Sequence, residues 1–224
     1  MRRAAAAALV PLAIGCGLLA AGCGEGTPTK GPARVTWVAY PETVVVGKAF
    51  PFEIAGPVGP STCARLDTSA VTVSDSGIVV SARRSVFHSF LCSPTRVSFY
   101  VPRPLRVERA GLYPVFTPER AALGTLVAVD SGAFSSLRTI GEGTVRRGGG
   151  CLLFGPGWAS NQRPFSLHGV SARIVALAGT DSVVRVVGDL AGFDQCGGLG
   201  SRPVIAADSA SVTGRLARDW YAGG

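Results

Sequence analysis

VTWVAYPETVVVGKAFPFEI, residues 35–54, decides the fold class of this chain. Apolar side chains alternate with others in VTWV at 35–38 and again in FPFEI at 50–54. Alternation places every second side chain on the same face, as a half-buried β-strand requires. The stretch is also rich in β-branched and aromatic residues, which favour strands. It predicts three short strands, at 35–39, 43–46 and 50–54.

The same pattern continues to residue 130. Short β-branched and aromatic runs are separated by Gly and Pro, with turn signals such as DSG at 75–77 and no convincing helical stretch. Further strands are predicted at 71–73, 78–81, 96–101, 113–116 and 123–129. About seven or eight strands in roughly 95 residues is the count of an immunoglobulin-like sandwich. We therefore expect such a sandwich over residues 34–130.

The sequence AGLYPV at 110–115 resembles the entry to a late strand in many immunoglobulin-like and fibronectin-like modules. The resemblance implies that Tyr113 packs at a corner with its hydroxyl bonded to the backbone. Pro114 departs from the pattern, because proline cannot donate a ladder hydrogen bond. We expect this strand to lie at an edge of the sheet or to begin after Pro114.

A second β-rich unit follows a short Ser/Gly-containing connector at 131–140. Its five predicted strands lie at 143–147, 151–154, 165–169, 182–188 and 203–206. The spacing of its glycines, with a long connection at 170–180, resembles small OB-fold modules of exported bacterial proteins. The resemblance implies a five-stranded OB-like barrel over 141–211, so the whole chain is expected to be all-β. A generic hairpin-rich domain is the alternative, and residues 212–224 are expected to form a tail that either docks through Trp220 or is disordered.

The N-terminus carries an export signal. Arg2 and Arg3 precede an almost wholly apolar run at 4–21, which is typical of a secretory signal peptide. The run ends in LAAGC at 19–23, which resembles the lipobox of bacterial lipoproteins, although Ala20 stands where Leu is usual. The resemblance implies that residues 1–22 are removed, that Cys23 is lipidated, and that residues 23–33 form a tether. A lipobox-like match at Cys16 and a plain secretory signal are the alternatives.

Four cysteines remain in the mature chain besides Cys23: Cys63, Cys92, Cys151 and Cys196. In an oxidising compartment an even number indicates disulfides, and three connectivities are possible. We favour Cys63–Cys92 and Cys151–Cys196, because each pair then lies within one expected domain. No CxxC or His-containing ligand spacing is present, so neither zinc nor another cofactor is expected.

The charge of the chain says little about a partner. Removing residues 1–22 takes away two Arg and no acid, so the formal net charge falls from +8 to +6. A basic protein can favour anionic headgroups or envelope polymers. Nucleic acid is not an expected partner outside the cytoplasm.

No catalytic motif is present. His88 and His168 lie in apolar strands, and the acids Asp181, Asp189 and Asp194 are interpreted as turn residues. The candidate binding residues are Trp158 and Arg163, in the ten-residue loop 155–164 between two barrel strands, because Trp and Arg anchor many interfaces. Phe154 and Phe165, on the flanking strands, are interpreted as core residues. The alternative for Trp158 is that it merely caps the barrel.

These features predict a lipid-anchored, non-enzymatic protein of the bacterial cell envelope that binds a protein or a glycan through its β domains. The membrane is contacted through the N-terminal lipid. Two alternatives stay open: a structural envelope lipoprotein with no specific ligand, and a hydrolase of unrecognised type.

Overall fold

The structure is a computed structural model that describes residues 27–89, 91–156 and 164–220. The fold is all-β, with 63% of the described residues in strands and 6% in helices. Within these ranges no helix is long and apolar enough to cross a membrane. Three predicted functional residues, Cys23, Trp158 and Arg163, lie outside the described residues.

Strands up to residue 130 form the first unit: β1 (Thr29–Pro32), β2 (Trp37–Pro41), β3 (Thr43–Val45), β4 (Phe50–Gly59), β5 (Ala64–Ser74), β6 (Gly77–Val86), β7 (Val97–Leu105), β8 (Gly111–Phe116) and β9 (Ala122–Val129). The second unit consists of β10 (Leu137–Gly148), β11 (Cys151–Pro156), β12 (Phe165–His168), the helical turn α1 (Ala172–Val175), β13 (Ser182–Gln195), the 3-10 turn η1 (Gly197–Leu199), β14 (Ser201–Leu216) and the 3-10 turn η2 (Ala217–Trp220). Each strand that the sequence predicts overlaps one of these strands. β1 is additional, because TKGP carries no apolar pattern and forms a strand by pairing its backbone with β6.

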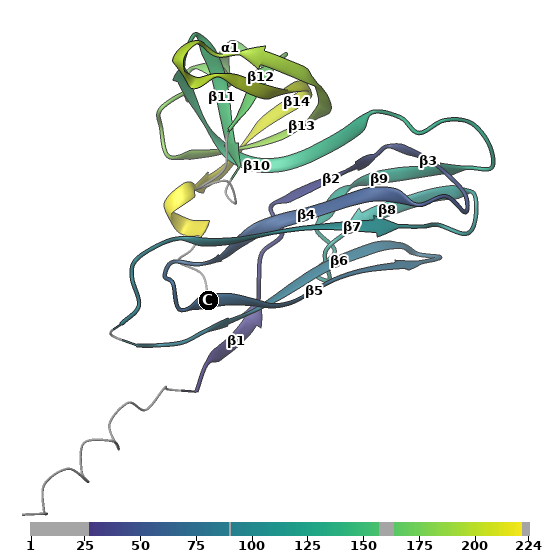
Figure 1. Ribbon diagram of the computed structural model, residues 1–224, viewed down its shortest axis with the longest axis horizontal. Coiled ribbons are helices and arrows are strands. Elements are labelled where there is room, and N and C mark those ends of the chain that lie inside the picture. The colour runs from purple at the N-terminus through teal and green to yellow at the C-terminus, as the bar shows by residue number, and fades with distance from the viewer. Residues whose placement is uncertain (1–26, 90, 157–163, 221–224) are drawn as a thin grey trace, which may run out of the picture.

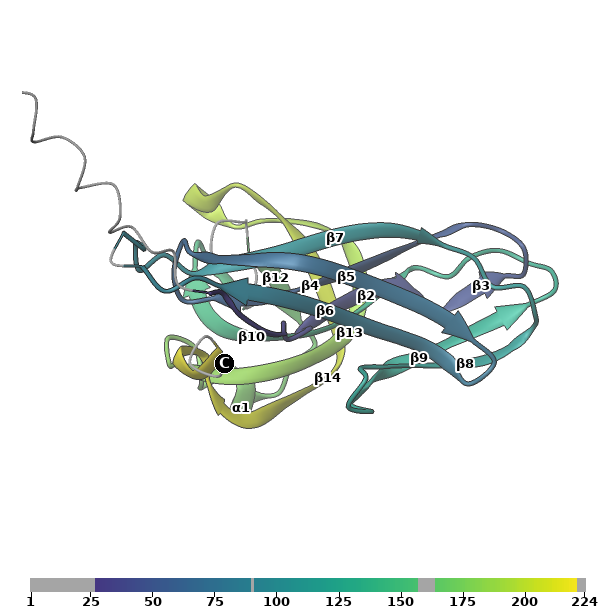
Figure 2. The same ribbon diagram turned by 90° about the horizontal axis from the view of Figure 1, so that it is seen from below.

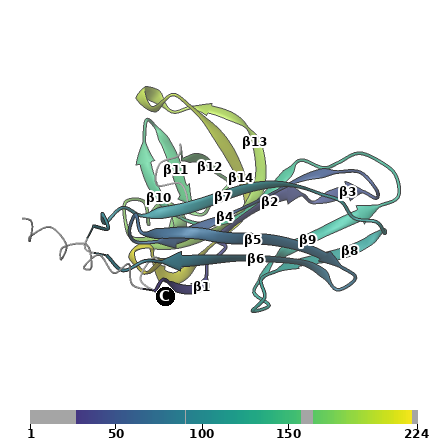
Figure 3. The same cartoon turned by 60° about the horizontal axis from the view of Figure 1, so that its bottom comes forward.

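The first unit is a two-layer sandwich (Figure 3). One layer contains β2, β4 and β7, and the other has the order β1-β6-β8-β9-β3 with β5 also paired to β6. Alternate residues of β4 point between the layers, so Phe52 and Ile54 are fully buried against Ile78 and Leu126 of the opposite layer. Tyr40 of β2 stacks on Phe52 with ring centroids 5.3 Å apart. Burying each such side chain stabilises the fold by roughly 1.5–3 kcal/mol.

Tyr113 occupies a corner, as its motif predicts. Its ring is buried, and its hydroxyl donates a hydrogen bond to the carbonyl oxygen of Arg109 at 2.9 Å. The expectation for Pro114 is only partly met. β8 lies between β9 and β6 and includes Pro114, but its parallel pairing with β6 begins at Val115. The proline therefore lies where β8 has a single neighbour, and its missing N–H removes no bond to β6.

The second unit closes into a ring of five strands (Figure 1). β10 pairs with β11, β11 with β12, β12 with β14, β14 with β13, and β13 with β10. The β12–β14 pairing is parallel and the other four are antiparallel. Phe154, Leu167 and Ile205 fill the centre with Ile174 of α1. A closed ring leaves no unpaired strand edge among these strands.

β10 joins the two units. It begins at Leu137, inside the predicted connector 131–140, and its first residues pair with β2 on one side and β13 on the other. The cores interpenetrate here: Ile140 of β10 belongs to the sandwich core, whereas Trp37 of β2 packs in the barrel core. Trp37 also stacks on Phe165, with ring centroids 5.0 Å apart. Residues 137–140 are therefore a structural part of both units.

Ion pairs reinforce this junction. The half-buried carboxylate of Glu142 on β10 binds Arg34 at 3.0 Å and Arg215 of β14 at 2.5 Å. Arg138 of the same strand lies 2.7–3.7 Å from three carboxylates, those of Glu42, Asp189 and Asp208. Both charged groups sit among several partners, so the strand that connects the units is held by charge as well as by packing.

The last described residues, 217–220, are docked on the barrel. β14 extends to Leu216, beyond the predicted limit of the barrel at residue 211. Trp220 of η2 is buried beside Val183 and Ala217. The docked alternative for Trp220 is therefore the one observed.

Both predicted disulfides are present. Cys63–Cys92 joins the turn after β4 to the loop between β6 and β7, and Cys151–Cys196 joins the start of β11 to the end of β13. Each closes a loop within one unit. In the chain-entropy view, loops of these lengths contribute roughly 3.5–4 kcal/mol each by restricting the unfolded chain.

Candidate functional site

A polar cluster lies on the outer face of the barrel. Phe165 and Leu167 of β12 point inward, so the alternating residues Ser166 and His168 point outward. Asp194, near the end of β13, meets both: its Oδ2 accepts a hydrogen bond from Ser166 Oγ at 2.5 Å and lies 2.6 Å from His168 Nε2. β12 and β13 both pair with β14, which brings residues 26 and 28 positions apart together.

Hydrogen bonding sets the charge of this cluster. The Ser166 hydroxyl lowers the pKa of Asp194 below its ordinary value of 3.8, and the hydrogen bond and charge of His168 act in the same direction. Partial burial opposes them but is the smaller effect overall. Asp194 is therefore an ionised acceptor at neutral pH.

The three side chains do not form a nucleophilic triad. In a triad the carboxylate orients one imidazole nitrogen while the other nitrogen takes the serine proton. Here Ser166 Oγ and Asp194 Oδ2 both lie on Nε2 of His168, at 3.4 and 2.6 Å. The Ser166 hydroxyl also donates its hydrogen bond to the carboxylate, and Ser166 is only 1% exposed. His168 and Asp194 reach the surface, with side chains 54% and 28% exposed, so the cluster suits binding.

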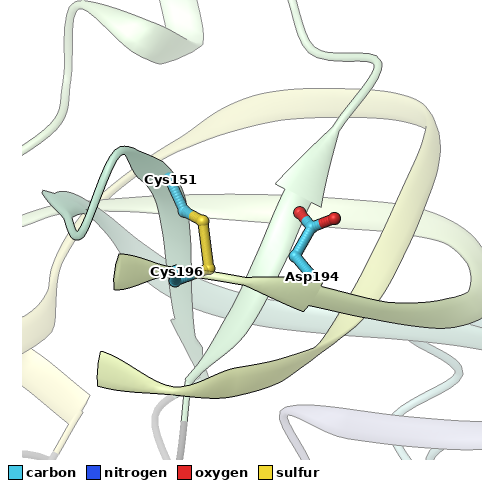
Figure 4. Close-up of side chains that lie close together, drawn as sticks. All are labelled: Cys151, Asp194 and Cys196. Carbon is cyan, nitrogen blue, oxygen red and sulfur yellow. A yellow bond between two sulfur atoms is a disulfide. The ribbon is translucent and has the colours of Figure 1, made fainter. Parts of the chain in front are cut away.

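A disulfide borders the cluster (Figure 4). The sulfur atoms of Cys151 and Cys196 and a carboxylate oxygen of Asp194 all lie within 4.8 Å of one another, the one such group of potential metal ligands in the described ranges. The two sulfurs are bonded to each other at 2.09 Å. A disulfide sulfur is not a thiolate, so the group lacks the ligands that zinc requires.

The disulfide also holds two loops together. Gly149, in the turn between β10 and β11, has φ +58°, and a Cβ there would lie 1.8 Å from the carbonyl oxygen of Cys196. Only glycine permits both that conformation and that approach. The turn after β10 is therefore packed against the segment that connects β13 to β14.

Arg202, beside the cluster, has hydrogen-bond donors without acceptors. It lies opposite Asp194 in the β13–β14 pairing and is 91% buried. Its Nε and Nη1 atoms have no hydrogen-bond partner. Buried donor groups without acceptors are costly, so these two nitrogen atoms are donor capacity that the described residues leave unused.

The two aromatic residues that flank the predicted binding loop pack in the core. Phe154 is fully buried, and Phe165 packs on Trp37, so both aromatic residues are core, as interpreted from the sequence. The described strands β11 and β12 end at Pro156 and begin again at Phe165, on either side of the loop that contains Trp158 and Arg163.

Sequence reasoning missed the cluster. Asp194 was expected in a turn but is a strand residue that meets β12, and Ser166 carries no signal of its own. Asp189 likewise binds Arg138 from within β13. The one usable signal is that Ser166 and His168 alternate with apolar residues, which places them on the same outer face. The partner from β13 has no such signal. His88, the other candidate, lies 3.2 Å from the hydroxyl of Thr29.

A shallow groove of about 470 Å³ lies elsewhere, on the sandwich. Phenylalanine and proline side chains of β4 and β7 line it, together with Arg103. Arg103 already donates hydrogen bonds to the carbonyl and the hydroxyl of Ser69, at 3.0 and 3.1 Å. The groove therefore offers no convergent polar groups of the kind that orient a ligand.

No protein-family model matches the chain, and comparisons with curated proteins and with solved structures give no match.

Proposed function

We propose that this protein is a lipid-anchored component of the bacterial cell envelope that binds a protein or glycan partner through the outer face of its barrel. No covalent chemistry is assigned to it. The observation that carries the binding role is the exposed His168–Asp194 pair beside two loops that a disulfide holds together.

The N-terminal sequence supports the anchor. The lipobox-like LAAGC at 19–23 would make Cys23 the first residue of the mature chain. The two disulfides favour an oxidising compartment, which is consistent with export. Acyl chains on one cysteine can hold a protein on a bilayer without a spanning helix.

The connectivity supports an OB-like barrel and an immunoglobulin-like sandwich. OB folds are five-stranded Greek-key barrels that bind ligands on strands 2 and 3, between the loops that follow strands 1 and 4. The corresponding strands here are β11 and β12, and the corresponding loops are those joined by Cys151–Cys196. The hydrogen bond from Tyr113 to Arg109 supports the sandwich assignment, because such tyrosine corners are typical of that fold.

Site-specific crosslinking in native envelopes tests the proposal. A photo-reactive amino acid at position 168 should capture one partner, because His168 lies on the proposed face. The matched control is position 112 on β8, where Leu112 is 70% exposed at the far end of the sandwich. Capture of the same molecule from both positions, or from neither, would contradict a barrel-specific partner.

Affinity for the captured partner then tests the predicted anchors. Trp158→Ala should weaken binding by about 2 kcal/mol, roughly 30-fold, if Trp158 is an interface anchor. The melting temperature should change little. A large loss of stability with unchanged binding would show that Trp158 caps the barrel and does not anchor this interface.

A further inference from the structure

One end of the sandwich combines the start of the described chain with an exposed apolar tip. Thr29 of β1 pairs with Val86 at the end of β6, and its hydroxyl lies 3.2 Å from His88. Residues 87–96 connect β6 to β7 at the same end, and Cys63–Cys92 ties this connection to the turn after β4. The connection is also fixed by a backbone hydrogen bond from Phe87 to Cys63. Its position is therefore set by the fold.

Leu91 is the apolar tip of this connection. It is 77% exposed, the most exposed large hydrophobic side chain in the described part of the chain. The adjacent Cys92 is held by the disulfide, and the backbone N–H of Leu91 donates a hydrogen bond to Ser89 Oγ at 3.2 Å. Transfer of this side chain from water into an apolar environment would be favourable.

Basic side chains lie at the same end of the sandwich, where Lys30 and Arg65 both pair with Ser85 near the end of β6. Lys30 on β1, Arg65 on β5 and Arg96 before β7 are all exposed. The guanidinium of Arg65 lies over the ring of Phe87, 4.6 Å from its centroid. Asp67, the acid beside Arg65, is partly neutralised by it at 3.8 Å and accepts a hydrogen bond from Ser85. An exposed leucine and basic side chains at the same end of the sandwich match an anionic lipid surface, where each Lys or Arg near the surface strengthens binding.

The length of the tether limits how far β1 can lie from the membrane. Six residue steps separate Cys23 from Thr29, and a fully extended chain covers at most about 3.5 Å per residue. An acyl anchor at Cys23 therefore holds Thr29 within about 20 Å of the bilayer. β8, β9 and β3 lie together at the opposite end of the sandwich (Figure 2).

We propose that this end of the sandwich rests on the membrane, with Leu91 inserted among the acyl chains and Lys30, Arg65 and Arg96 on anionic headgroups. The inference rests on the proposed anchor at Cys23. It gives the molecule one orientation, in which the tip around Leu91 faces the lipid.

Fluorescence quenching by lipid tests this orientation. The full lipidated protein is reconstituted into vesicles of phosphatidylethanolamine and phosphatidylglycerol that carry brominated acyl chains. Leu91→Trp should add fluorescence that is blue-shifted and quenched by the brominated lipid. Leu112→Trp is the matched control, since Leu112 is a similarly exposed leucine at the opposite end, and its added fluorescence should be neither shifted nor quenched. The parent protein corrects for the three native tryptophans.

The outcomes separate the orientation from the anchor. Mass spectrometry of the purified chain first shows whether Cys23 is acylated, and its absence overturns the anchor itself. With acylation present, equal quenching at both positions, or none at position 91, overturns the orientation. Replacing phosphatidylglycerol by phosphatidylcholine should reduce the quenching of Leu91→Trp, and unchanged quenching would overturn the contact with anionic headgroups.

Discussion

Gly141 lies against the Trp37 indole at the junction of the two units. It lies opposite Trp37 in the β10–β2 pairing, and a Cβ there would be 2.3 Å from Cε3 of the indole. The rigid indole is held by Phe165 and cannot move aside. Gly141→Ala should therefore destabilise the protein by about 1–3 kcal/mol, measured by denaturant unfolding.

Gly155 provides the control for this substitution. It lies in β11, and the nearest atom to a Cβ there is Thr144 Oγ1 at 3.8 Å, an ordinary contact. Gly155→Ala should leave the stability unchanged or raise it slightly by restricting the unfolded chain. Equal losses from both variants would mean that the indole does not set the requirement for glycine at 141.

Asp194 should make stability depend on acid pH. Its folded pKa lies below the unfolded value of about 3.8, so it stabilises the fold above that pH and loses this effect as pH falls through the folded value. The difference in unfolding free energy between the parent and Asp194→Asn should be constant above about pH 5 and should shrink below about pH 3.8. Urea titrations at several pH values measure it.

Asp75→Asn is the matched control for Asp194. Asp75 forms an ion pair with Arg109 at 3.3 Å, but both side chains are strongly exposed. Exposed pairs contribute little, so this variant should differ from the parent by less than about 1 kcal/mol at every pH. If the difference in unfolding free energy between the parent and Asp194→Asn did not shrink in strong acid, the hydrogen-bonded state of the Asp194 carboxylate would be refuted.

At the scale of elements, the entry to β8 depends on one hydroxyl. Tyr113→Phe removes the hydrogen bond to Arg109 and should cost about 1 kcal/mol in thermal or urea unfolding. Tyr40 of β2 is the control because its hydroxyl is buried without a hydrogen-bond partner, and burial raises its pKa far above the usual range. Tyr40→Phe should therefore be neutral or stabilising. A larger loss of stability for Tyr40→Phe than for Tyr113→Phe would contradict the role of the Tyr113 hydrogen bond at the start of β8.

At the scale of the whole molecule, the sandwich and the barrel should unfold together. β10 pairs with both β2 and β13, and Trp37 of the sandwich packs in the barrel core. Calorimetry of the parent should show a single transition whose calorimetric and van't Hoff enthalpies agree. Trp37→Ala should cost about 3–5 kcal/mol and uncouple the units into two transitions. Two well-separated transitions in the parent would show that the junction does not couple them.

The sequence by itself determined the β character and the position of each predicted strand, and it favoured the disulfide pairing that the structure shows. These depend on local properties: the period of two in apolar side chains, the turn residues between strands, and the short loops that each disulfide closes. The strand predicted at 165–169 matches β12 within one residue for this reason. The local pattern could also have placed Ser166 and His168 on one outer face.

Only the tertiary structure decided how these elements combine. The sequence gives no sign that residues 137–140 belong to a strand shared by both units, because that role depends on pairing with β2, about a hundred residues earlier. For the same reason Trp37 lies in a predicted sandwich strand but packs in the barrel core. Asp194 is predicted to be a turn residue but binds Ser166 and His168. Strand pairing sets which distant side chains meet, and it is a property of the closed sheet rather than of any segment.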